Sequence, residues 1–228
     1  MKTKTTLLLF FVFIYLIGNS QELPSPRISL QFGMAMPMSE LAATDPDLIS
    51  SGFAETGFGA AIEGIIFVDK YLATGLRFGG SFIKSKDDLS GLVPDSNASL
   101  KADGLYKIQN VMIGLYYIRT LGQKFSVIGK LMTGVVFATT PEYKLYYEFE
   151  DTSKNYDLDI RGGSTSGPGF LIGIGGIYSL GKIIDLSLNL DYNYSKPEFD
   201  RTLLGERIKY KQRLVILGVN VGIAFKLK

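Results

Sequence analysis

The sequence predicts an all-β fold, an eight-stranded antiparallel up-and-down transmembrane β-barrel, from three observations. Apolar and polar residues alternate with a period of two through segments of about ten residues, which is the length that a tilted strand needs to cross a bilayer. Short and long connections between these segments strictly alternate along the chain. The 26 Gly, 13 Tyr and 15 Phe, without Trp, favour a closed β-architecture, in which glycine and regularly spaced aromatic residues recur.

The chain begins with a segment that is typical of a secretory signal peptide. Two lysines precede an apolar run over 7–17, and small residues occupy the −3 and −1 positions of a cleavage site after Ser20. The apolar run is too short to span the bilayer core of about 30 Å. We therefore expect residues 1–20 to be cleaved on export and residues 21–228 to form a single outer-membrane β-barrel domain.

Alternation predicts eight strands in the remaining chain, joined by connections of two kinds. Three connections are tight turns, near 69–70, 121–124 and 180–182, and carry the Asp, Gly and Lys that hairpin turns accept. The other four are long and rich in Pro, Asp, Ser, Asn and Gly, so one end of the barrel should carry turns and the other end loops, as in outer-membrane barrels. The expected strands are 27–36, 56–68, 71–84, 105–120, 125–139, 167–179, 183–195 and 208–227. The expected loops are 37–55, 85–104, 140–166 and 196–207.

Each strand has an apolar face and a smaller, more polar face. Alternation alone does not say which face is inside, because a soluble lipocalin-like barrel would bury the apolar set and show the same period. The polar face is rich in Gly and poor in charge, unlike a soluble surface, and aromatic residues gather at both ends of the apolar face, as at two membrane interfaces. The membrane orientation is therefore favoured. The aromatic residues are Phe58, Phe82, Phe137, Phe170, Tyr192 and Tyr194 toward the loops, and Tyr117, Phe125, Tyr178 and Phe225 toward the turns. The apolar face of the last strand includes Val215, Leu217, Val219, Val221 and Ile223.

Composition restricts the chemistry that the chain can perform. The formal net charge of +2 gives no basic field for nucleic acid, so no nucleic-acid partner is expected. The chain has no His and no Cys, which excludes Ser-His-Asp hydrolases, other His-dependent barrel enzymes and Cys nucleophiles. Paired carboxylates at 45–47 and 157–159 lack the Gly and terminal Glu of a calcium loop, and no metal site is predicted there. We expect no enzyme activity and no cofactor.

Four charged residues share the inward parity on the second, third, fifth and seventh expected strands. They are Glu63, Arg77, Lys130 and Asp191. Because buried charges are tolerated when they are paired, these side chains are expected to form an ion-pair network that plugs the lumen. The alternative is a narrow, water-lined pore; the small interior of an eight-stranded barrel favours plugging.

A segment over 142–151 alternates charged with aromatic residues beyond the expected membrane edge. It would prolong the fifth strand outward as an exposed sheet edge that recruits a partner by strand addition or aromatic contact. The alternative is that it packs against the other loops, because exposed edges are usually protected. The residues expected to contact a partner are Tyr143, Tyr146, Tyr147 and Phe149.

The end of the chain resembles the assembly signal of outer-membrane proteins. Asn220, Gly222, Phe225 and Leu227 fill its polar, glycine, aromatic and hydrophobic positions, with Lys228 as one trailing residue. Together with the leader and the eight strands, the mature chain resembles small Gram-negative outer-membrane barrels, most of all the PorT-like outer membrane protein beta-barrel domain family. The resemblance implies residence in the outer membrane and contact with its lipid and with the barrel assembly machinery. It also implies, for some relatives, a link to protein secretion.

Two functions remain open at this point. The first is a non-enzymatic interaction or scaffold protein that binds an unidentified protein partner through its long extracellular loops. The second is a narrow passive channel for ions or very small solutes. A lipid-modifying enzyme has little support in a chain without His or Cys.

Overall fold

The computed structural model describes residues 23–44, 51–86, 98–147, 156–160, 163–203 and 206–227. Within these ranges only the backbone is described for 98–103, 143–147, 156–160, 201–203 and 206–208. The elements are β1 (Arg27–Met38), the 3-10 helix η1 (Ser39–Leu41), β2 (Gly57–Phe67), β3 (Leu72–Lys84), β4 (Ala98–Asp103), β5 (Leu105–Thr120), β6 (Phe125–Thr139), β7 (Glu142–Tyr147), β8 (Tyr156–Ile160), β9 (Ser164–Ser179), β10 (Ile184–Ser195), β11 (Glu198–Leu203), β12 (Glu206–Lys211) and β13 (Leu214–Lys226). No helix of the described ranges is long and apolar enough to cross a membrane.

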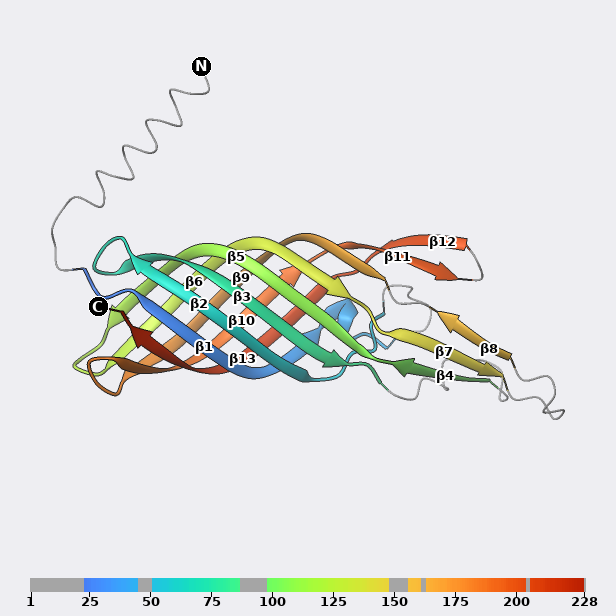
Figure 1. Ribbon diagram of the computed structural model, residues 1–228, viewed down its shortest axis with the longest axis horizontal. Helices are drawn as coiled ribbons and strands as arrows, with labels where there is room; N and C mark the ends of the chain where they lie inside the picture. The colour runs from blue at the N-terminus through green and yellow to red at the C-terminus, as the bar shows by residue number, and fades with distance from the viewer. Residues whose placement is uncertain are drawn as a thin grey trace, which may run out of the picture.

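Eight of these strands close into one antiparallel barrel, which confirms the predicted fold class. Their order around the wall is β1-β13-β10-β9-β6-β5-β3-β2, and β1 returns to β2 to complete the circle (Figure 1). Arg27 pairs with Lys226 where the first and last strands meet. The N–H of Leu227 donates to the C=O of Pro26 at 2.8 Å, so the first and last described strands join at the end that carries the short turns.

The prediction of one last strand over 208–227 is wrong, because β12 and β13 are separate. Gln212 and Arg213 lie between them, and Pro197 stands opposite Gln212 without an N–H to donate to the ladder. The register nevertheless continues across the break, since Ser195 pairs with Leu214 and the next hairpin pairs Glu198 with Lys211. The hairpin β11–β12 therefore prolongs the hairpin β10–β13 outward.

The expected loops 85–104 and 140–166 also contain strands, β4, β7 and β8. The ladder of β6 with β9 continues into that of β7 with β8 in the same register, through a hydrogen bond from the N–H of Thr140 to the C=O of Gly163 at 3.0 Å. On the other side Gly104, with φ of +101°, supplies one extra residue between β4 and β5, as in a β-bulge. β7 is thus the middle strand of a three-stranded sheet, and the expectation of an exposed edge at β7 is wrong.

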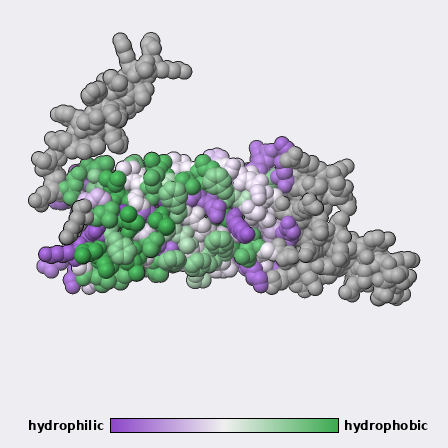
Figure 2. All heavy atoms as spheres, in the orientation of Figure 1, coloured by the Kyte–Doolittle hydropathy of each residue, from purple (hydrophilic) through white to green (hydrophobic). Residues whose placement is uncertain are grey.

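The apolar face of the barrel is outside. Ile174 and Leu115 are each 63% exposed and Leu188 is 57% exposed, and hydrophobic residues cover much of the barrel wall in Figure 2. Val215 is an exception to the predicted outer set: it lies between Met38 and Tyr194 in the ladder and is buried. The inner face is polar only in part, because β5, β6 and β9 also direct large apolar side chains inward. These buried residues are Tyr106, Ile108, Met112, Tyr116, Ile118, Ile128, Met132, Val136, Leu171 and Ile177.

Candidate functional site

The four charged residues expected in the lumen meet in the structure as one neutral cluster. Glu63 on β2 pairs across the ladder with Arg77 on β3 and forms an ion pair with it. Lys130 Nζ lies 2.7 Å from Glu63 Oε1 and 3.0 Å from Asp191 Oδ1, and Arg77 Nη1 lies 3.3 Å from Asp191 Oδ2. Each cation therefore touches both carboxylates, and the charges cancel. At most 5% of any of these residues is exposed, so the cluster forms a closed ionic bridge across the interior.

Neutral side chains complete this cluster. Asn220 Nδ2 donates to Asp191 Oδ2 at 3.1 Å, and Gln31 Oε1 accepts from Arg77 Nη1 at 3.4 Å. Gly173 leaves the room that the cluster needs, because a Cβ there would stand 2.5 Å from both Lys130 Cε and Asp191 Oδ1. The sequence placed Asn220 on the polar face of the last strand and gave it a role in the assembly signal, but its contact with Asp191 was not predicted.

A second charged cluster, which sequence reasoning missed, lies toward the short-turn end. Asp185 is fully buried, and its carboxylate lies 2.8 Å from Lys226 Nζ and 3.4 Å from Arg27 Nη1. The hydroxyl of Ser179 donates to Asp185 Oδ1 at 2.6 Å, and the Arg27 guanidinium lies 5.5 Å from the centre of the Phe67 ring. The parity of Arg27 and Asp185 was visible in the sequence. Their contact depends on the closure of β1 against β13, which no local pattern reveals.

Large inner side chains fill the barrel beside inward-facing glycines. A Cβ on Gly75 would stand 2.9 Å from the Tyr116 ring, and a Cβ on Gly114 would stand 2.7 Å from Met132 Cγ. The hydroxyl of Tyr116 donates to Met132 Sδ at 3.4 Å, so these two large residues also contact each other. At these two glycines the neighbouring strand and its inner side chains fill the space that a larger residue would need, so the packing resembles that of a protein core.

The loop end of the barrel is closed by the connection between β1 and β2. Leu41 of η1 is fully buried, and its C=O accepts the N–H of Ala54 at 3.0 Å. The hydroxyl of Tyr106 donates to the C=O of Gly52 at 2.9 Å, which ties the connection to the inner wall. Glu40 holds the outer side of the connection to the link between β12 and β13, with Oε1 3.0 Å from Arg213 Nε. Further buried residues of this apolar group are Ala35, Ile83, Phe199, Leu214 and Ile216.

Two antiparallel sheets extend past the barrel at this end, away from the short turns (Figure 1). One is β4-β7-β8 and the other is the hairpin β11–β12, in which Phe199 and Tyr210 stack with ring centroids 5.6 Å apart. Of the residues expected to contact a partner, Tyr143, Tyr146 and Tyr147 belong to β7. The side chains of these three tyrosines and the whole of Phe149 lie outside the described part of the chain.

The outer wall carries the aromatic residues that the sequence placed near its two ends. Toward the loops the rings of Phe170 and Tyr194 stack with centroids 5.0 Å apart, and toward the turns the ring centroids of Tyr117 and Tyr71 are 6.3 Å apart. Phe58 stacks at 6.2 Å on Phe32, which was not among the aromatic residues expected near either end. An apolar surface of this kind around a closed ladder, whose strands satisfy one another's backbone hydrogen bonds, suits lipid and not water. The wall and interior together define a transmembrane β-barrel.

The residues of the expected assembly signal lie on both faces of β13 and directly after its last residue. Phe225 and Leu227 are outward and exposed, whereas Asn220 is buried in the lumen. Gly222 is also inward, because a Cβ there would stand 2.7 Å from Ser187 Oγ. Packing in the lumen is therefore sufficient to explain why Asn and Gly occupy positions 220 and 222. Recognition of these residues by the assembly machinery stays a prediction.

Comparisons with known proteins bear on the fold. No family model matches the chain, and no curated protein matches it in sequence. Among solved structures it is similar to Neisserial surface protein A, at 11% identity and a TM-score of 0.49, over 89% of this chain and 97% of that one. It is also similar to a major outer membrane protein of Thermus thermophilus, at 13% identity and a TM-score of 0.47, over 89% of this chain and 100% of that one. It is similar as well to the outer membrane protein OprG of Pseudomonas aeruginosa, at 11% identity and a TM-score of 0.43, over 90% of this chain and 98% of that one. The resemblance to the PorT-like family stays a prediction.

Proposed function

We propose that the chain is an integral outer-membrane β-barrel that catalyses no reaction and acts as an interaction or scaffold protein through its projecting sheets. One observation carries the proposal: the interior is filled, while the strands continue past the apolar wall at the loop end. A protein of this design has its accessible polar surface at the two ends, and the projecting sheets lie at one of them. Residence in the outer membrane and a link to secretion accord with the resemblance of the sequence to PorT-like proteins.

The packing of the lumen favours this function over a passive channel. An ion that crossed the barrel would have to separate Lys130 from Glu63 and Asp191, and then displace the buried Leu41 at the loop end. Breaking a buried ion pair costs about 3–5 kcal/mol, which is a large barrier to repeated passage. The barrel is therefore expected to be electrically silent, and stable conductance steps of the purified protein in planar bilayers would contradict the proposal.

The projecting sheets offer a partner two kinds of contact. Their outer strands present backbone groups for strand addition, a mode of recognition that requires little side-chain specificity. The stacked pair of Phe199 and Tyr210 holds β11 against β12, so the hairpin presents a preformed surface. Because the formal net charge is only +2, a protein partner is proposed and a nucleic acid is not.

Site-specific photo-crosslinking in intact cells tests this function. A crosslinking side chain at the exposed Lys209 of β12 should capture a protein, while the same group at Lys70, in the turn between β2 and β3, serves as the matched control at the other end. A second variant replaces residues 198–211 with a two-residue turn, which keeps the pairing of Ser195 with Leu214. Capture that is equal at Lys209 and Lys70, or no capture at Lys209, would refute the proposed role of the hairpin.

The location is tested separately. The mature protein should fractionate with the outer membrane, and its gel mobility should change on boiling, as expected for a folded barrel. N-terminal sequencing should show that the mature chain begins at Gln21 if residues 1–20 are a cleaved signal peptide. Gln21 and residues 1–20 lie outside the described part of the chain. A soluble periplasmic protein with unchanged mobility would refute the membrane assignment.

A further inference from the structure

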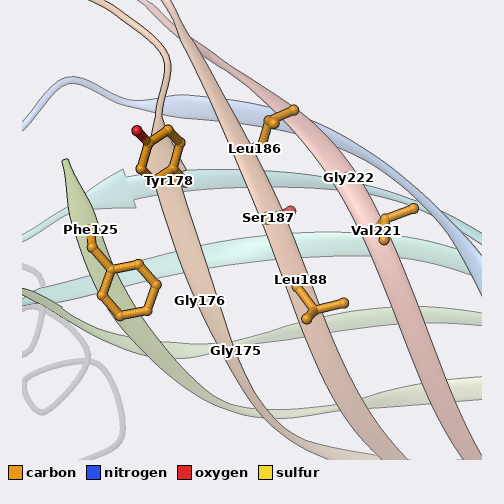
Figure 3. Close-up of a pocket in the computed structure, with 9 residues that line it drawn as sticks. All are labelled: Phe125, Gly175, Gly176, Tyr178, Leu186, Ser187, Leu188, Val221 and Gly222. Atoms are coloured by element: carbon orange, nitrogen blue, oxygen red, sulfur yellow. The ribbon is translucent and has the colours of Figure 1, made fainter.

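A groove of about 540 Å³ crosses the outer wall near the short-turn end (Figure 3). Its floor is Gly176, which faces outward on β9, and a Cβ at this position would approach only the Phe125 ring, at 3.1 Å. Phe125 and Tyr178 bound one side of the groove in Figure 3, and Leu188 stands on the other side. The surface inside is almost wholly apolar, so the groove has the chemistry of an acyl-chain site.

The end of this groove toward the turns is positively charged. The turns 121–124 and 180–183 lie side by side, since the N–H of Ser179 donates to the C=O of Lys124 at 2.8 Å. Lys124 and Lys182 are both exposed, as is Arg119 at the end of β5. The sequence has no Asp or Glu over 118–126 or 179–184, and the next carboxylate, Asp185, is buried against its own two cations.

We propose that this groove binds an anionic phospholipid of the leaflet on the short-turn side, with one acyl chain over Gly176 and the phosphate at Lys124, Lys182 and Arg119. The inference rests on the membrane assignment in the proposed function and adds a specific lipid to it. Basic side chains near a bilayer surface each strengthen the binding of anionic lipid by about fivefold. The apolar groove fixes where the chain lies, and the basic residues select the headgroup.

The barrel also contains a matched groove without the basic end. It too measures about 540 Å³ and is apolar, and its floor is Gly64, whose Cβ position has nothing within 4 Å. The turn next to it carries Asp69 and Lys70, whose charges cancel. Among the described residues that line this groove the one cation is Arg27, which is paired with Asp185. The two grooves therefore offer similar room for an acyl chain and differ in headgroup charge.

The absence of Trp from the chain allows each groove to be read by one fluorophore. The Phe125→Trp variant reports on the Gly176 groove, and the Ile66→Trp variant reports on the Gly64 groove, which Ile66 lines. Each is reconstituted in phosphatidylcholine vesicles, and quenching is measured with phosphatidylglycerol or phosphatidylcholine that carries brominated acyl chains. The ratio of the two quenching curves gives the relative binding constant of the anionic lipid at each groove.

We expect phosphatidylglycerol to be preferred by about fivefold or more at the Phe125→Trp position and to show a ratio near one at the Ile66→Trp position. Adding Lys124→Gln and Lys182→Gln should bring the first ratio toward one, and adding Gly176→Leu should lower it by filling the groove. Equal ratios at the two grooves, or a preference that survives the double lysine substitution, would overturn the site. If neither lipid quenched either fluorophore, the membrane assignment itself would fail, and this site with it.

Discussion

Removal of one carboxylate from the lumen cluster should destabilise the barrel strongly. The Glu63→Gln variant leaves two buried cations, Arg77 and Lys130, facing only Asp191. At a separation of about 3 Å and an effective dielectric constant of about 20, each charge pair contributes roughly 5 kcal/mol before the cost of desolvation. Measured losses after the breaking of buried pairs are about 3–5 kcal/mol, and we expect a decrease of that size in the unfolding free energy.

A double substitution distinguishes the contribution of the Glu63–Lys130 ion pair from the effect of burying each side chain. Glu63→Gln combined with Lys130→Gln restores neutrality, because Arg77 still lies 3.3 Å from Asp191. The double variant should lose less stability than the two single variants together, with an interaction energy of about 1–3 kcal/mol. Urea unfolding in phospholipid vesicles, followed by tyrosine fluorescence and by heat-modifiable gel mobility, measures all four proteins. A loss below about 1 kcal/mol for Glu63→Gln, or additivity within about 0.5 kcal/mol, would show that the cluster is hydrated and the lumen open.

Two further comparisons test the assignment of inside and outside, both by unfolding in lipid vesicles. Leu188→Arg places a charge on the exposed mid-wall surface and should lower the unfolding free energy by about 2–4 kcal/mol. Asn189→Ala should lower it far less, because no hydrogen bond within the described residues holds Asn189 Nδ2. Equal losses would contradict the orientation of β10. Gly114→Leu should cost about 1–3 kcal/mol or more, because a Cβ there would lie 2.2 Å from the Leu131 carbonyl oxygen, while Gly129→Leu meets nothing within 4 Å and should be nearly neutral. The reverse order would place Gly114 on the lipid side.

The strands of the barrel could be predicted because each of them separates two unlike environments. The spans 105–120 and 125–139 match β5 and β6 to the residue, and five others differ by at most three residues at either end, whereas the span 208–227 merges β12 with β13. This signal ends where the wall ends: the strands of the projecting sheets do not stand between lipid and lumen, and their sequence no longer has to alternate. The pairing that continues beyond Pro197 in the same register, and beyond Gly104 with a shift of one residue, is therefore a tertiary property that a period-two pattern does not encode.

The candidate site was predictable to the extent that parity specifies it. Inward parity alone identified Glu63, Arg77, Lys130 and Asp191, because a charged residue in the middle of an amphipathic strand must find partners in the lumen. The cluster around Asp185 was missed because two of its members are near the ends of the chain and become neighbours only when the barrel closes. The apolar filling of the lumen was missed for a different reason. Strands β5, β6 and β9 are apolar on much of both faces, and their inner residues pack against one another as in a soluble core.

Glycines on the inner face of the wall are filled by neighbouring side chains, whereas glycines on the outer face leave open grooves. This difference indicates which surfaces of the protein have room for a ligand. An inward glycine such as Gly173 is filled by the side chains of Lys130 and Asp191, so each one helps to close the lumen. An outward glycine such as Gly176 has no neighbour to fill it except the edge of one ring, so it leaves a groove that only lipid or a partner can occupy. Because inner side chains fill the space beside the inward glycines, we expect binding at the outer wall and at the projecting sheets. A mutational search for function should therefore begin on these surfaces and not in the lumen.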